Sequence, residues 1–138
     1  MIQALGKKKN SIAITHLKKG KFNITINNIP FNLISPDYIK YKILEPVYLS
    51  GVKSTLNFSL NTFVKGGGFI SRIYAIRQSI AKVLLKYYNN HLEKSNKNEL
   101  RLLFMHFDKH LLFRDTRVKQ PKIYGGRGSK ARFQKSYR

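Results

Sequence analysis

The chain has 138 residues, of which 42% are hydrophobic, so it is long enough for one domain with a substantial core. Its 27 Lys and Arg against 6 Asp and Glu give a formal net charge of +21, and such self-repulsion predicts a polyanionic partner. The lack of cysteine excludes disulfides and thiolate metal sites, and no apolar run approaches the roughly 18 residues of a membrane span, so we expect an intracellular protein without a membrane partner.

The first third of the chain alternates apolar and polar residues, which is typical of β-strands. Residues 11–17 alternate in this way around Ile12 and Ile14, and residues 22–26 do so again. The basic, glycine-containing stretch 18–21 separates the two runs. We therefore predict two strands that pair with each other as a β-hairpin.

A helix and a third strand are predicted next. Ser35 followed by Pro36 is typical of an N-cap and a first helical position, so a helix should run to about Leu44. Pro46 should break or restart that helix. Residues 56–64 alternate again, which predicts a third strand that ends at a run of glycines.

Residues 69–90 have the spacing of a long amphipathic helix. Its apolar stripe is predicted to consist of Ile73, Ile76, Ile80, Val83, Leu84 and Tyr87. The opposite, polar side carries Arg72, Ser79, Lys82 and Lys86. We expect the stripe to face the core and the polar side to face solvent or a partner.

A last helix is predicted after Asn96 and Glu99, which resemble a capping pair. Its inward residues should be Leu100, Leu103, Phe104 and Phe107. After Asp115 the periodicity stops, and residues 117–138 carry eight basic residues and no acidic one. The sequence thus predicts an α+β body at 1–115 and an extended basic C-terminal arm at 116–138, which nothing within the chain should order.

Gly66, Gly67 and Gly68 lie where the third strand gives way to the long helix, a natural place for an anion. A nucleotide site is disfavoured, because the P-loop Lys-Ser/Thr pair is absent and Ser71 occupies the third glycine position of the dinucleotide fingerprint. Two interpretations remain open. The glycines either permit a tight turn and close packing, or they hold a single RNA phosphate.

Catalytic and metal-binding patterns are weak in this sequence. His106 and His110 are four residues apart, but no third ligand is at hand and Lys109 would oppose a cation. There are no closely paired carboxylates, no G-x-S-x-G motif and no cysteine nucleophile. We therefore predict no catalytic residue, no metal, no cofactor and no enzymatic activity.

The basic residues are the strongest functional signal, because they recur on several predicted elements without matching acids. The arm also carries Tyr124, Phe133 and Tyr137, which could stack on unpaired bases while Lys and Arg meet phosphates. No groove-reading helix motif is visible, so RNA is favoured over duplex DNA.

Several long stretches resemble one known family. They are GKKKNSIAITHLKKGKFNITINN at 6–28, YKILEPVYL at 41–49, KGGGFISRIYAIRQSIAKVLLKYY at 65–88 and DKHLLFRDTR at 108–117. With the ending GGRGSKARFQKSYR, they are similar to the universal ninth protein family of the small ribosomal subunit, in its cytosolic eukaryotic form.

The resemblance implies a fold and partners beyond what the residues alone predict. The body would be an α+β sandwich of the kind found in the second domain of ribosomal protein five. It would sit in the head of the small (40S) subunit, on the 3′ major domain of the small-subunit rRNA and beside other head proteins. The arm would reach the anticodon stem-loop of the P-site tRNA through Lys135, Tyr137 and Arg138. The protein would work in the cytoplasmic ribosome after assembly in the nucleolus.

The resemblance also implies an rRNA-binding set. In the body it comprises Lys7, Lys8, Lys9, Lys18, Lys19, Lys65, Gly66, Gly67, Gly68, Arg72, Arg77 and Lys82. In the arm it comprises Lys119, Lys122, Arg127, Lys130 and Arg132.

Two rival hypotheses are a basic nucleic-acid-binding module that acts outside the ribosome and a small phosphate-handling enzyme that uses the glycine junction.

Overall fold

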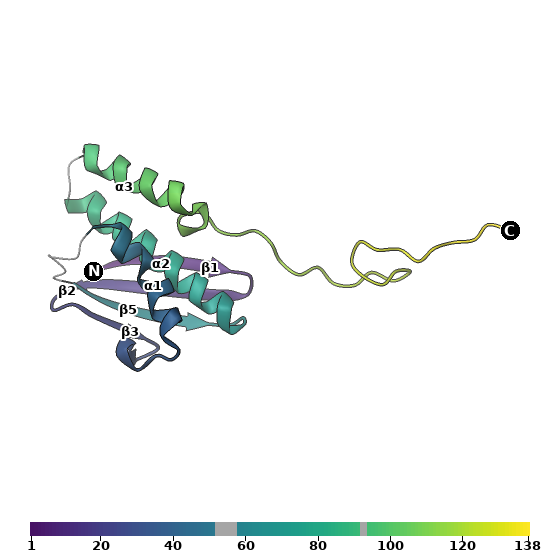
Figure 1. Cartoon of the computed structure of the whole chain (residues 1–138), viewed down its shortest axis with the longest axis horizontal. Helices are drawn as coiled ribbons and strands as arrows, with labels where there is room; N and C mark the ends of the chain where they lie inside the picture. The colour runs from purple at the N-terminus through teal and green to yellow at the C-terminus, as the bar shows by residue number, and fades with distance from the viewer. Residues whose placement is uncertain (52–57, 92–93) are drawn as a thin grey trace.

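A five-stranded mixed sheet forms the base of the body in this computed structural model, which describes residues 1–51, 58–91 and 94–138 (Figure 1). The strands are β1 Ile2–Lys8, β2 Ser11–Lys19, β3 Asn23–Ile26, β4 Ile29–Pro30 and β5 Phe58–Lys65. Their order across the sheet is β1-β2-β5-β3-β4, with β3 parallel to β5 and the other neighbours antiparallel. The α+β class predicted from the sequence is therefore confirmed.

Helices cover one face of this sheet (Figure 1). They are α1 Asp37–Leu49, α2 Phe69–His91 and α3 Lys94–Phe107, with short 3-10 turns η1 Phe31–Leu33 and η2 Lys109–Leu111. Helix α2 packs on β1 and β2, α1 packs beside α2, and α3 packs on α2 (Figure 1). After η2 there is no further helix or strand, and the chain runs away from the body (Figure 1).

The predicted hairpin of residues 11–29 is wrong in its pairing, although both strands exist. Strand β5 lies between β2 and β3, so Leu60 of β5 stands opposite Leu17 of β2 and Ile24 of β3. The hairpin partner of β2 is instead β1, for which no strand was predicted. Small inward residues such as Ala4 and Gly6 leave no strong alternation to detect in β1.

The inward face of β2 carries mostly small side chains. Ser11, Ala13, Thr15 and Leu17 are buried beneath α2, whereas the isoleucines at 12 and 14 face outward. Small inward side chains are required because α2 lies close to this strand. The apolar alternation therefore predicted a strand correctly, and the structure places its two isoleucines on the outer face.

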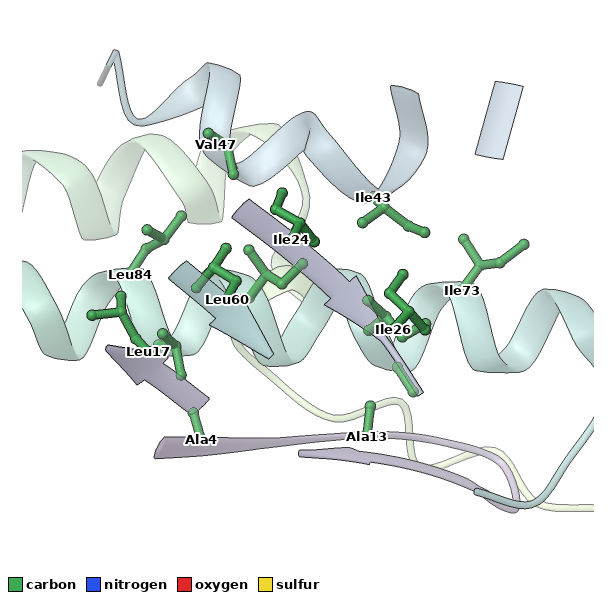
Figure 2. Packing of buried hydrophobic residues seen from close by; sticks show 14 of the residues in the cluster. Ala4, Ala13, Leu17, Ile24, Ile26, Ile43, Val47, Leu60, Ile73 and Leu84 are labelled. Carbon is green, nitrogen blue, oxygen red and sulfur yellow. The ribbon is translucent and has the colours of Figure 1, made fainter. Parts of the chain in front are cut away.

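The core joins both sheet and helices (Figure 2). Leu17, Ile24 and Leu60 rise from the strands toward Val47 of α1 and Leu84 of α2 (Figure 2). The predicted stripe of α2 is confirmed, because its five aliphatic members are buried and Tyr87 packs against them.

Ser79 was expected on the solvated side of α2, but it lies in the interior. It is fully buried, and its hydroxyl lies 2.6 Å from that of Thr15 and donates to the Ile76 carbonyl at 2.8 Å. The Thr15 hydroxyl is also 3.0 Å from that of Thr62 on β5. This buried chain of hydroxyls satisfies polar groups where α2 crosses the sheet.

Helix boundaries differ from the predicted ones at three points. Helix α1 begins after Pro36 rather than after Ser35, and it continues through the buried Pro46 to Leu49, because packing on the core offsets the lost backbone hydrogen bond. Helix α3 begins at Lys94, so Asn96 lies inside it and is not its N-cap.

The inward face of α3 is narrower than predicted. Phe104 is fully buried in a second cluster with Ala81 and Leu111, and Leu100 packs against it. Leu103 and Phe107 are 43% and 51% exposed, contrary to the prediction.

Leu56, predicted as part of the third strand, lies outside the described residues.

Gly6 marks the closest approach of β1 to α2. A Cβ at this position would lie 2.1 Å from the Ala75 carbonyl oxygen and 2.7 Å from the Ser79 backbone nitrogen, both on α2. Neither atom can move without shifting the helix, so only glycine fits here.

We expect Gly6→Ala to lower the free energy of unfolding by about 1–3 kcal/mol, because the added methyl forces β1 and α2 apart. Urea unfolding followed by circular dichroism measures this. Gln3→Ala is the matched control on the same strand, since Gln3 is exposed and Lys86 of α2 bonds to its backbone carbonyl. Equal stability of the two variants would contradict the close approach.

Candidate nucleic-acid interface

Five predicted RNA-binding residues meet at one end of the body, which we term the basic end: Lys7, Lys8, Lys9, Lys65 and Arg72. The first three lie at the end of β1 and in its turn to β2, Lys65 ends β5 and Arg72 lies in the first turn of α2. In the sheet register, Ile12 of β2 stands between Lys7 and Lys65. The fold therefore concentrates positive charge that is scattered in the sequence.

The glycine junction packs against the β1–β2 turn at this end. Gly66 and Gly67 have φ of 77° and 64°, in the left-handed region. A Cβ on Gly66 would lie 2.6 Å from the Asn10 carbonyl oxygen, and one on Gly67 would lie 2.0 Å from Ser11 Oγ. The packing interpretation thus accounts for these two glycines.

Gly68 differs, because no atom lies within 4 Å of the place its Cβ would occupy. The Gly66 carbonyl accepts hydrogen bonds at 3.0 Å from both Ser11 Oγ and Arg72 Nε, which fixes the junction in front of α2. This bond uses only the Nε donor of Arg72, so it does not involve the other N–H groups of the guanidinium. A phosphate contact at Gly68 and Arg72 stays a prediction.

Asp115 ties the root of the arm to the basic end. Its carboxylate is buried, accepts a hydrogen bond from Lys8 Nζ and is 2.8 Å from Arg117 Nη2. Hydrogen bonds from Arg117 and Lys8 hold the pKa of the Asp115 carboxyl far below its usual range. This role of Asp115 was not predicted, since Lys8 and Asp115 are far apart in the chain.

Arg77 is a correction to the predicted RNA-binding set. It is 2% exposed, with Nε 2.6 Å from Glu45 Oε2 and Nη1 2.5 Å from Asp108 Oδ2. Burial tends to raise the pKa of Asp108, but hydrogen bonds from Arg77 and the His110 amide outweigh it and lower that pKa. Arg77 therefore joins α1, α2 and the residue after α3, and it does not reach the surface.

Lys82 also has an internal partner. Its ammonium group donates to the Leu5 carbonyl at 3.2 Å, Lys86 donates to the Gln3 carbonyl at 2.9 Å, and Gln78 Oε1 accepts from the Lys7 amide at 2.8 Å. Partial burial and the nearby Lys86 lower the pKa of Lys82. These side chains cover the free edge of β1, so Lys82 supports the fold as well as carrying charge.

Lys18 and Lys19 are exposed, but they lie at the other end of β2, opposite Ser59 and Phe58 of β5. The fold therefore does not bring them to the basic end. The predicted arm residues are all exposed: Lys119, Lys122, Arg127, Lys130, Arg132, Lys135, Tyr137 and Arg138.

The arm contains a closed loop at residues 123–133, which we term the arm loop. The Phe133 amide donates to the Gly125 carbonyl at 3.1 Å, and Arg132 Nη1 donates to the Tyr124 carbonyl at 3.0 Å. These bonds differ from the expectation that nothing within the chain orders the arm. The glycines at 125 and 126 were the sequence signal for a turn.

The two histidines do not share a helix, because His106 lies in the last turn of α3 and His110 lies in η2. Within the described ranges there is no group of three His, Cys, Asp or Glu side chains that could hold a metal ion. Over the same residues, no helix combines the length and apolar character needed to cross a membrane.

Replacing Arg77 tests its assignment to the interior. Arg77→Met should lower the free energy of unfolding by about 3 kcal/mol, because two partly buried carboxylates lose their partner. Arg72→Met at the basic end should lower stability much less, because it removes only one exposed hydrogen bond, to the Gly66 carbonyl. Thermal and urea unfolding of both variants provide the measurement, and an unchanged Arg77→Met protein would refute the buried ion-pair assignment.

Comparison with known proteins gives matches along nearly the whole chain. The family described as "Ribosomal protein S9/S16" matches residues 6–138. The chain is 44% identical to the small ribosomal subunit protein uS9 of Debaryomyces hansenii and to that of Candida albicans, and 42% identical to uS9A of Saccharomyces cerevisiae. Each match spans 137 residues, 99% of this chain and 96% of the relative. The chain therefore belongs to the ribosomal protein S9/S16 family, whose members are ribosomal proteins and not enzymes.

Proposed function

We propose that this protein is a structural constituent of the small ribosomal subunit, that it binds rRNA in the subunit head and that it supports P-site tRNA during translation. The observation that carries this proposal is the similarity to small-subunit proteins over 99% of the chain. The net charge of +21 supports it, because such a charge favours a polyanionic partner such as rRNA.

In this proposal the body, residues 1–115, binds rRNA phosphates through the basic end and through Lys18 and Lys19. The basic end offers several lysine ammonium groups and the guanidinium of Arg72 to neighbouring phosphates. The arm, residues 116–138, supplies further cations without acids. Its last residues, including Arg138, contact the tRNA anticodon stem-loop.

Three finer points belong to the same proposal. The fold is proposed to be the sandwich shared with the second domain of ribosomal protein five, and the mixed sheet with helices over one face supports this. Other proteins of the subunit head adjoin it. It works in the cytoplasmic ribosome after assembly in the nucleolus.

Sedimentation tests the proposal against a free nucleic-acid-binding module. A tagged chain expressed in a yeast should migrate with 40S subunits on a sucrose gradient and remain there after a moderate salt wash. A basic protein held only by nonspecific phosphate contacts would be released by the added salt. Recovery at the top of the gradient in both conditions would contradict a ribosomal role.

Deletion of Arg138 tests the tRNA contact. The residue is exposed at the end of the arm, so its loss should leave the body and subunit assembly unaffected. A charged hydrogen bond contributes about 1.5–3 kcal/mol when desolvated and less in a wet site, so P-site tRNA affinity should fall severalfold, most at low salt.

The measurement is initiator tRNA binding to purified small subunits across a salt series. Arg127→Ala, which also removes one exposed arginine from the arm, is the matched control and should affect tRNA binding less. Equal tRNA affinities with and without Arg138 would show that the tail does not contact tRNA.

A further inference from the structure

The arm loop gathers aromatic rings and positive charges around one hollow of about 550 Å³. Its lining residues are Tyr124, Gly125, Arg132, Phe133, Lys135 and Tyr137. Tyr124 and Tyr137 are 92% and 90% exposed, and the described contacts include none between rings of the hollow. Large rings held open to water in this way are characteristic of binding surfaces.

Hydrogen bonds within the arm bring these residues together. The hydrogen bond from Phe133 to Gly125 closes the loop, and the bond from Arg132 to the Tyr124 carbonyl holds the guanidinium beside Tyr124. A Cβ on Gly126 would lie 1.8 Å from the Ala131 carbonyl oxygen, so the closed loop requires glycine at that position. The hollow is therefore formed within the arm itself.

The chemistry of the lining selects the ligand. Aromatic faces favour a flat π-system, and the neighbouring Arg132 and Lys135 favour an anion attached to it. No acidic residue occurs between 116 and 138 that could repel the anion. A free phosphate would leave the rings unexplained, and an apolar peptide would leave the cations unexplained.

We propose that this hollow binds one unpaired nucleotide of single-stranded RNA, with the base stacked on Tyr124 and the flanking phosphates near Arg132 and Lys135. This inference rests on the proposed function, because it takes RNA as the partner. It adds a base-dependent contact at Tyr124 to the phosphate contacts proposed for the Lys and Arg residues of the arm. Arg132 can serve in this way because its bond to Tyr124 uses only one of its five donors.

Binding of the full chain to two probes tests the inference: a short single-stranded RNA, and a strand of the same length made of abasic residues. Tyr124→Leu should weaken binding to the RNA about tenfold, since stacking on one aromatic side chain is lost. It should leave affinity for the abasic strand and the salt dependence unchanged, because the phosphate contacts remain. Tyr124→Phe should bind like the unchanged protein.

Tyr41→Leu is the matched control, since Tyr41 is also exposed, at 67%, but lies on α1 outside the hollow. It should not alter binding to either probe. Gly126→Ala should reproduce the loss seen for Tyr124→Leu, because the loop must open. Gly128→Ala should not, because nothing lies within 4 Å of the place of its Cβ.

The outcomes separate this inference from the proposed function. If Tyr124→Leu has no effect on RNA binding, or weakens both probes equally, base stacking is refuted while salt-dependent binding of the unchanged protein still supports an RNA partner. If Gly126→Ala binds RNA normally, the preformed hollow is refuted. If the unchanged protein binds neither probe, the inference and the proposed function both fail.

Discussion

The close packing of α2 over β1 and β2 determines most of the other features of the body. Gly6 and the buried Thr15–Ser79 contact allow the helix to lie almost on the backbone of the sheet. At that distance the side chains on one side of α2, from Gln78 to Lys86, reach the free edge of β1 and pair its backbone groups. The same placement sets the first turn of α2 beside the β1–β2 turn, where the basic end forms.

Acidic residues are used mainly to hold the body together. Four of the six carboxylates form ion pairs in the described structure: Asp37, Glu45, Asp108 and Asp115. Arg77 engages two of these acids, and Lys8 and Arg117 share a third. Most of the other basic side chains that the structure describes are exposed and have few counter-charges nearby. This arrangement suits a protein whose counter-ions are the phosphates of its partner.

The sequence was sufficient to predict features that depend on local spacing. The apolar stripe of α2 and the alternation of β5 were predicted because each repeats within one element. The pairing of β2 was not predicted correctly, because β5, which lies between β2 and β3, comes from a distant part of the chain. The basic, glycine-containing stretch between β2 and β3 instead suggested a hairpin turn.

The same distinction applies to the candidate site. Exposed basic residues such as Lys9 could be identified from charge alone. Arg77 could not be separated from them, because its partners Glu45 and Asp108 come from distant parts of the chain. Lys82 likewise has its partner on β1. The hydrogen bonds of the arm loop depend on glycine geometry that composition does not reveal.

The arm loop also sets how far the chain can extend. Residues 116–138 could span at most roughly 75–80 Å if drawn out fully. Because Phe133 is bonded back to Gly125, the residues between them add little length, and the span falls to roughly 50 Å. Anchored at Asp115 at one end, the arm has a length fixed largely by one backbone hydrogen bond. Opening the loop would thus change the distance from Asp115 to the terminal residue even if every side chain were retained.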